Sequence, residues 1–207
     1  MSPYPLLLTS FLIASVPIIL TVGTCFLKIS IVLGMIKSAL GSQHTPSALL
    51  VTCFSLTLTY LIMEPVWIEV ANRSYVFLEN KKVNQKKDEL PIPTLDEFKN
   101  ITAPWVDFLE AHAAKKDIEL FKTLSKNQNS IGVLIAGFTL SELREAFLMS
   151  VTILIPFVAV DIVLANILVG MGMNMVSPSV IALPIKLLLF VYSDAWRVIF
   201  ESLVRSY

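Results

Sequence analysis

The stretch LIPFVAVDIVLANILVGMGMNMVSPSVIALPIKLLLFVYSDAW, residues 154–196, decides the fold of this chain. It holds two long apolar runs, which are separated by a short turn of Gly, Asn, Ser and Pro, the residue types that favour turns. A helix needs about 20 mostly apolar residues to cross a bilayer. Two such runs joined by a turn predict a helical hairpin for a membrane or a membrane-embedded complex.

The rest of the chain has the same hydrophobic character. Of its 207 residues, 55% are hydrophobic and 15% are charged, and the mean hydropathy is +0.73. An ordinary soluble domain is about 45–50% apolar and about 25% charged. Charges are sparse in four runs, 6–36, 48–70, 146–170 and 180–200. We therefore predict an all-α subunit of a membrane complex, built from two long helical hairpins.

Prolines within or at the ends of these runs predict that the helices are bent. Each proline removes a backbone hydrogen bond, and the carbonyl that it frees needs a partner inside the protein if lipid surrounds the helix. Bent helices therefore favour a packed assembly. The prolines are Pro17, Pro65, Pro156 and Pro184.

The middle of the chain, residues 71–130, is polar. It holds ten of the sixteen Lys and Arg and nine of the sixteen Asp and Glu. We expect three segments: an N-terminal hydrophobic hairpin (1–70), a polar helical insertion (71–130) and a C-terminal hydrophobic hairpin with a Met-rich turn (131–207). Four crossings would put the insertion and both termini on one side of the membrane. Charge balance leaves open which side that is.

Helix signals recur in the insertion. Thr94 and Glu97 have the spacing of a capping box, in which each side chain bonds the other's backbone N–H. Apolar residues at helical spacing follow, so we expect one or two amphipathic helices, with Pro104 beginning the second.

Apart from Glu69 and Arg197 near the ends of two runs, five charged residues lie inside the apolar runs. A charge at bilayer depth costs roughly 2.5–3.5 kcal/mol on insertion scales, so such residues usually face protein, water or one another. Three interpretations remain open: buried charges that hold an assembly together, a direct role in transport, and side chains that reach the interface near helix ends. The residues are Lys28, Glu64, Asp161, Lys186 and Asp194.

The number of residues between the turn and each charge suggests a partner for Lys186. With Asn174 as the centre of the turn, Asp161 lies 13 residues before it and Lys186 lies 12 residues after it. At about 1.5 Å per residue the two side chains reach nearly the same depth.

Several functional classes find no support in the sequence. Asp161 and Asp194 resemble an intramembrane aspartyl pair, but no HExxH, GxSxG or P-loop motif occurs. Cys25 and Cys53 form no CxxC pair, and we interpret them as small apolar residues. We expect no enzyme, no cofactor, no metal site and no nucleic-acid partner. The N-terminus has no basic stretch and is not interpreted as a cleaved signal peptide.

Four stretches together carry a family resemblance. GTCFLKISIVLGMIKSALGSQHTPS (23–47), LTYLIMEPVW (58–67), LSELREAFLMS (140–150) and the hairpin 154–196 resemble the FliP/SctR family of type III secretion export-apparatus subunits. The resemblance covers both hydrophobic parts of the chain. The short N-terminus looks more like the injectisome branch than the flagellar branch.

The resemblance implies a set of partners and a location. Family members assemble as five copies with FliR/SctT-like and FliQ/SctS-like subunits, beside other export-gate and basal-body components. The assembly handles secreted unfolded polypeptides and contacts membrane lipid. It lies in the bacterial inner membrane and partly on its periplasmic side, where the polar insertion would face. The resemblance also offers Glu142 of a neighbouring subunit as a second candidate partner for Lys186.

The family carries methionines at the turn of the last hairpin, where they seal a pore like a gasket. The resemblance assigns this role to Met171, Met173 and Met175, with Asn174 among them, although the family has consecutive methionines here. Methionine is apolar and adaptable, so several can fill an irregular gap. The alternative is that the three methionines fill a core. Gly170 and Gly172 would allow a tight turn, which Ser177 and Pro178 would end before the last apolar helix.

The expected function is therefore a subunit that lines and seals a protein-export channel. The alternative from another class is a small-ion or proton channel or transporter that uses Lys28, Glu64, Asp161 and Lys186.

Overall fold

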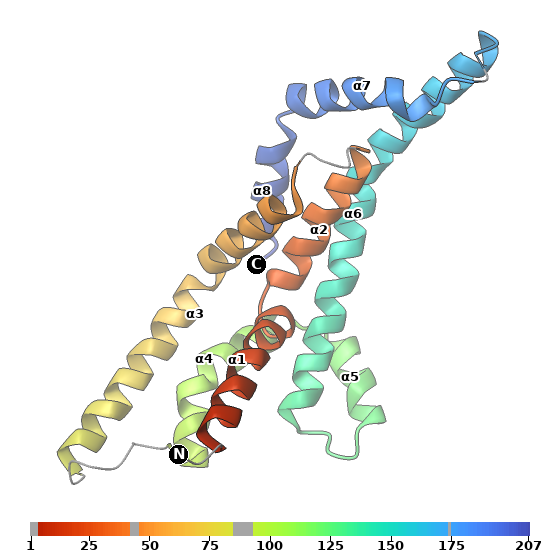
Figure 1. Cartoon of the computed structure of the whole chain (residues 1–207). Coiled ribbons are helices and arrows are strands. Elements are labelled where there is room, and N and C mark those ends of the chain that lie inside the picture. The colour runs from red at the N-terminus through yellow and green to blue at the C-terminus, as the bar shows by residue number, and fades with distance from the viewer. Residues whose placement is uncertain (1–3, 42–45, 85–92, 174) are drawn as a thin grey trace. The chain divides into compact units, whose positions relative to one another are not determined.

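A computed structural model describes residues 4–41, 46–84, 93–173 and 175–207, and the described residues form eight helices and no strand. The predicted all-α fold is confirmed (Figure 1). The helices are α1 (Tyr4–Val22), α2 (Phe26–Ala39), α3 (Ala48–Asn84), α4 (Leu95–His112), α5 (Lys115–Leu124), α6 (Ile131–Gly170), α7 (Pro178–Tyr192) and α8 (Ala195–Arg205).

Two of these helices are long and apolar enough to cross a membrane: Ala48–Glu79 within α3, and α6. Two pairs of shorter helices are long and apolar enough only when each pair is taken together, and each pair is bent at a short break. The pairs are Ala14–Val22 with Phe26–Ala39, and Pro178–Tyr192 with Ala195–Arg205. Each of the four apolar runs therefore contributes either one long helix or one broken pair.

The chain divides into two compact units, and each contains segments that are distant in the sequence. Unit 1 consists of Met1–Thr24 and Tyr60–Ser141, and unit 2 consists of Cys25–Thr59 and Glu142–Tyr207. The division into 1–70, 71–130 and 131–207 follows hydropathy along the chain and stays a prediction.

Unit 1 contains the polar insertion, whose described residues form the end of α3 together with α4 and α5. The predicted capping box is confirmed: the Thr94 side chain accepts from the Glu97 backbone N–H, and the Glu97 carboxylate accepts from the Thr94 backbone N–H at 2.7 Å. These contacts lower the pKa of Glu97, the Thr94 backbone N–H contributing most.

The predicted role of Pro104 is wrong. Pro104 is buried inside α4, and the second amphipathic helix, α5, begins at Lys115. A proline inside a helix frees the carbonyl four residues earlier, which here belongs to Asn100. Arg73 of α3 donates to that oxygen at 3.0 Å, and this bond helps α4 to continue through the proline.

Unit 2 is built around α2, the C-terminal part of α6, α7 and α8. Apolar side chains of α2 and α6 are buried here, and aromatic rings join the other elements. The rings of Phe157 (α6) and Phe190 (α7) are 6.1 Å apart, and Trp196 of α8 meets Phe190 edge-on at 5.0 Å. The predicted α6–α7 hairpin thus forms, with its Met-rich turn at the tip (Figure 1).

Candidate functional site

The turn at the tip of the α6–α7 hairpin has a defined backbone. Gly172 adopts a positive φ of 74°. The N–H of Gly172 donates to Val169 O at 3.0 Å, and the N–H of Met173 donates to Leu168 O at 2.9 Å. These two bonds are those of a Schellman motif, which ends a helix at a glycine in the left-handed region. Gly170 is the last residue of α6.

Of the three methionines of the turn, Met171 and Met175 are largely exposed at the hairpin tip, whereas Met173 is partly covered by its own chain. Their side chains are exposed by 68% at Met171, 41% at Met173 and 101% at Met175. They therefore fill no core within this chain. Asn174 lies outside the described residues.

Helix α7 begins at Pro178, one of the two residues expected to end the turn. A proline fits this position because its fixed φ suits a helix and its missing N–H has no partner there. The hydroxyls of Ser177 and Ser179 are 2.7 Å apart.

Lys186 is buried in unit 2 and bonds two groups. Its ammonium donates to Asp161 Oδ2 at 2.6 Å and to the Ala39 carbonyl at 3.0 Å. Asp161 is therefore the partner within the chain, and the second contact lies at the C-terminus of α2, where the helix dipole favours a cation. The pair borders an open, mainly apolar groove of about 660 Å³.

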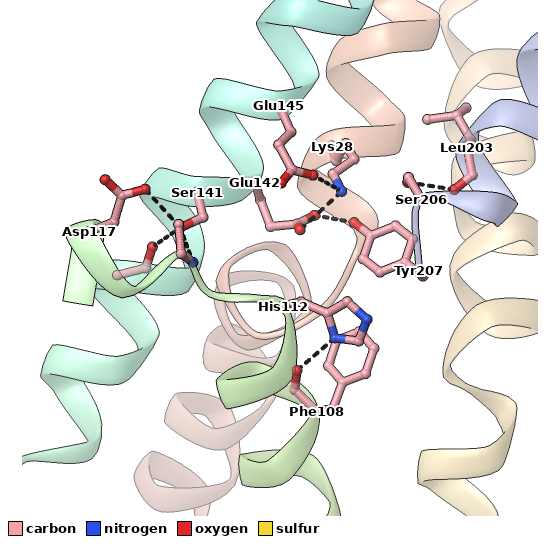
Figure 2. Close-up of polar contacts among 12 residues, drawn as sticks. Lys28, Phe108, His112, Asp117, Ser141, Glu142, Glu145, Leu203, Ser206 and Tyr207 are labelled. Atoms are coloured by element: carbon pink, nitrogen blue, oxygen red, sulfur yellow. Dashed lines mark hydrogen bonds and ion pairs between the residues drawn. The ribbon is translucent and has the colours of Figure 1, made fainter.

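Lys28 forms a second charged centre, deeper in unit 2 (Figure 2). Its ammonium, on a side chain that is 1% exposed, donates to Glu145 Oε2 at 2.7 Å. It also forms an ion pair with Glu142 Oε1 at 3.2 Å, without hydrogen-bond geometry. Glu142 is as buried as Lys28, whereas Glu145 is half exposed.

Tyr207 completes this centre from beyond the end of α8. Its hydroxyl donates to Glu142 Oε2, and its ring centre lies 4.1 Å from the Lys28 ammonium (Figure 2). Burial and the negative charge of Glu142 raise the pKa of Tyr207, so the phenol stays protonated and remains a donor.

The structure therefore brings together some of the predicted charges and separates others. Lys28 shares a centre with Glu142, and Lys186 shares another with Asp161. Glu64 is exposed on α3, and Asp194 is exposed between α7 and α8 in the left-handed region, with φ 49°. The predicted burial of Glu64 and Asp194 is therefore not found within this chain.

Sequence reasoning did not identify Glu145, Tyr207 or the Ala39 carbonyl as partners. Glu145 could have been found, because it lies one helical turn after Glu142 in LSELREAFLMS. Tyr207 carried no comparable signal, since its contact joins the end of the chain to a helix 65 residues earlier.

The described residues contain no group of three or more His, Cys, Asp or Glu side chains that could hold a metal ion. Cys25 is a buried free thiol and Cys53 an exposed one.

Comparison with known proteins gives consistent similarities across the chain. A model described as the FliP family matches residues 7–203. The virulence protein YscR of Salmonella typhimurium is 32% identical over 100% of this chain and 97% of its own length. The flagellar biosynthetic protein FliP of Bacillus subtilis is 34% identical over 98% of this chain and 90% of its own length. The hypersensitivity response secretion protein HrcR of Ralstonia nicotianae is 30% identical over 98% of this chain and 96% of its own length.

Proposed function

The chain belongs to the FliP family, and from this premise we propose that it is a core subunit of a type III protein-secretion export gate. The observation that carries the proposal is the match along residues 7–203, which includes both hydrophobic parts and the polar insertion. Relatives of similar length are named as a flagellar biosynthetic protein, a virulence protein and a hypersensitivity response secretion protein. The family is a structural component of the secretion apparatus, and we assign no reaction to this chain.

The Met-rich turn is proposed to seal the export channel. Met171 and Met175 are large apolar side chains that the hairpin exposes at its tip, and the Gly172 turn fixes the backbone that carries them. Copies of this tip meeting around an axis would remove the methionines from water and fill the opening. Thioether side chains can then deform around a passing polypeptide, because they are unbranched.

The two lysine centres are proposed to hold the shape of unit 2 that assembly needs. Lys186 joins α2, α6 and α7, and Lys28 joins α2, α6 and Tyr207, which lies beyond the end of α8. We propose that about five such subunits pack with FliR/SctT-like and FliQ/SctS-like subunits, in the bacterial inner membrane and partly on its periplasmic side. Glu64 and Asp194 would be covered in that assembly.

The ion-channel alternative gains little from the geometry. It needs Lys28, Glu64, Asp161 and Lys186 along one path, yet the two lysines each occupy a separate ion pair and Glu64 is exposed. The branch of the family stays a prediction, because the flagellar and virulence relatives above have similar identities, 34% and 32%.

The experiment that tests the proposed function is gene deletion with complementation. Without this chain, the host should lose type III secretion while general Sec-dependent export continues, and the gene supplied on a plasmid should restore secretion. Purification from the native membrane should recover the chain in a complex with other export-gate subunits. Normal type III secretion in the deletion strain would overturn the proposal. Ion flux from the purified chain alone in liposomes would support the channel alternative.

A further inference from the structure

The first apolar run, 6–36, is broken in the structure. Helix α1 ends at Val22 and α2 begins at Phe26. The end of a helix leaves its last four carbonyls without partners in the helix. In an apolar segment such carbonyls need partners within the protein, since lipid offers none. The carbonyl oxygens at the break therefore need hydrogen-bond donors from other parts of the protein.

Two of these carbonyls are satisfied locally. The N–H of Gly23 donates to Ile19 O at 2.8 Å, and the Thr24 hydroxyl donates to Leu20 O at 2.5 Å.

Two more carbonyls at the break, that of Val22 at the end of α1 and that of Gly23 just beyond it, accept from side chains that are distant in the sequence. Thr139 of α6 donates its hydroxyl to Val22 O at 3.2 Å. Trp105 of α4 donates its indole N–H to Gly23 O at 2.7 Å. All four of these residues belong to unit 1. The polar insertion thus supplies a donor at the point where α1 ends.

The Trp105 ring also lies directly against the backbone. A Cβ added to Gly23 would come within 2.9 Å of Trp105 Cζ2 and 2.8 Å of Ile19 O, distances that real Cβ atoms essentially never show. Gly23 is therefore required by the close approach of the indole, and its own φ is not in the left-handed region.

Other contacts hold the insertion in place. The Ser141 hydroxyl of α6 accepts from the Ala114 N–H and lies 2.9 Å from the buried Asp117 carboxylate of α5 (Figure 2). Gly137 of α6 leaves room for Ile118, whose backbone lies about 3.0 Å from where a Cβ would be. These contacts pack the insertion against α6, so the donors Trp105 of α4 and Thr139 of α6 are held in one packed unit.

We propose that the polar insertion is an internal clamp: its Trp105, together with Thr139 of α6, ends α1 at Val22 and keeps the first apolar run broken. Trp105 and Thr139 are positioning residues, and their role concerns the chain's own backbone. The inference gives the insertion a task that the proposed export function does not assign, and it stands independently of that function.

The hydrogen bond can be tested in the unaltered chain. In the complex labelled with ¹⁵N-tryptophan, the indole N–H of Trp105 should exchange with deuterium far more slowly than that of Trp67, whose side chain is 40% exposed. Equally fast exchange of the two indole N–H groups would overturn the clamp. This experiment needs no variant, so a folding defect cannot affect its result.

The role of the donor is tested by Trp105→Phe, which keeps a ring against Gly23 and removes the N–H. Backbone exchange in peptides covering residues 17–28 should become about tenfold faster, the size expected when one buried acceptor loses its donor. In a Cys53→Ser background, maleimide should also label Cys25 faster, because that fully buried thiol follows the break directly. Trp67→Phe is the matched control and should leave both rates unchanged. Wild-type rates in Trp105→Phe would contradict the proposal.

The close approach is tested by comparing two glycines. Gly23→Ala places a methyl group against Trp105 and should accelerate exchange at residues 17–28. Gly34→Ala, in α2, meets no atom within 4 Å and should leave that exchange unchanged. Equal effects of the two substitutions would overturn the clamp, because helix propensity alone would then explain them.

Discussion

Lys28 and Lys186 are buried lysines, and each is neutralised within its own chain. Removing one member of a buried ion pair typically costs about 3–5 kcal/mol, because the other charge is left without a partner. Because both lysines are buried, substituting either one should lower the stability of the protein measurably, and the change reports on the local ion pair.

For Lys186, we predict that Lys186→Ala lowers the thermal stability and yield of the purified complex, because Asp161 and the Ala39 carbonyl lose their donor. The charge-swapped Asp161→Lys with Lys186→Asp should recover part of the loss. The corresponding swap with Glu142 should recover none, since Glu142 already contacts Lys28 and Tyr207. Lys126→Ala, in an exposed loop, is the control. Wild-type stability of Lys186→Ala would show that the pair is dispensable.

For Tyr207, we predict that Tyr207→Phe destabilises the complex by about 1–3 kcal/mol, the usual cost of leaving a buried acceptor without its donor. The ring that faces Lys28 remains, so the substitution isolates the hydroxyl bond to Glu142. The measurement is the unfolding midpoint in detergent. Tyr192→Phe, at a side chain that is 88% exposed, should change nothing. Equal midpoints for the two variants would refute the role of the Tyr207 hydroxyl.

At the scale of single elements, the ends of the helices carry the most specific signals. α4 begins at a capping box, α6 ends in a Schellman motif and α7 begins at Pro178. In each case a small set of residues fixes where the helix stops or starts, so substitutions there have separable effects.

At the α6 end, we predict that Gly172→Val impairs secretion more than Ser177→Ala. A β-branched residue is strained at φ 74°, at a cost of roughly 1–2 kcal/mol, whereas Ser177 makes no capping bond to the α7 backbone. Gly170→Val is the matched control, because Gly170 lies within the helix and an added Cβ meets no atom there. The opposite order of Gly172→Val and Ser177→Ala in a secretion assay would contradict this account of the turn.

At the α4 start, we predict that Thr94→Ala weakens the helix by about 1 kcal/mol, the usual cost of a lost N-cap. A pH effect should accompany it. Because the native pKa of Glu97 lies below its ordinary value of 4.5, its contribution is complete above that value and is lost as the pH falls through the native pKa. Hydrogen exchange of the α4 amides in the unaltered chain, compared at each pH with that in Glu97→Gln, measures this loss. Identical pH profiles for the unaltered chain and Glu97→Gln would count against the capping box.

The scale of the whole molecule shows how far the sequence predicts the structure. Patterns within one stretch were sufficient for the α6–α7 hairpin, the Thr94–Glu97 cap and the depth match of Asp161 with Lys186, because spacing along a helix determines them. Contacts between distant segments were not predictable in this way. The Tyr207–Glu142 bond joins residues 65 positions apart, and the Trp105–Gly23 bond joins residues 82 positions apart.

The error at Pro104 has the same physical origin. The local rule, that proline begins or ends a helix, assumes that the freed carbonyl has no other donor. Here Arg73, 27 residues before Asn100, supplies that donor, and α4 continues. A tertiary hydrogen bond overrode the local preference.

The central claim is that the methionine turn seals the export channel, and ion leakage tests it most directly. In Met171→Ala/Met173→Ala/Met175→Ala, the complex should assemble at wild-type yield, because these side chains fill no core in their own chain. A core role would instead cost about 2–5 kcal/mol for each large-to-small substitution.

The measurement is ion or dye flux across the inner membrane of cells that express the triple variant, alongside the yield of purified complex. Alanine substitution of three exposed apolar residues of α7, Val180, Leu188 and Val191, is the control and should leave the membrane tight. We predict leakage with normal yield for the methionine variant. Normal yield with a tight membrane would contradict the seal, and low yield without leakage would assign the methionines to packing.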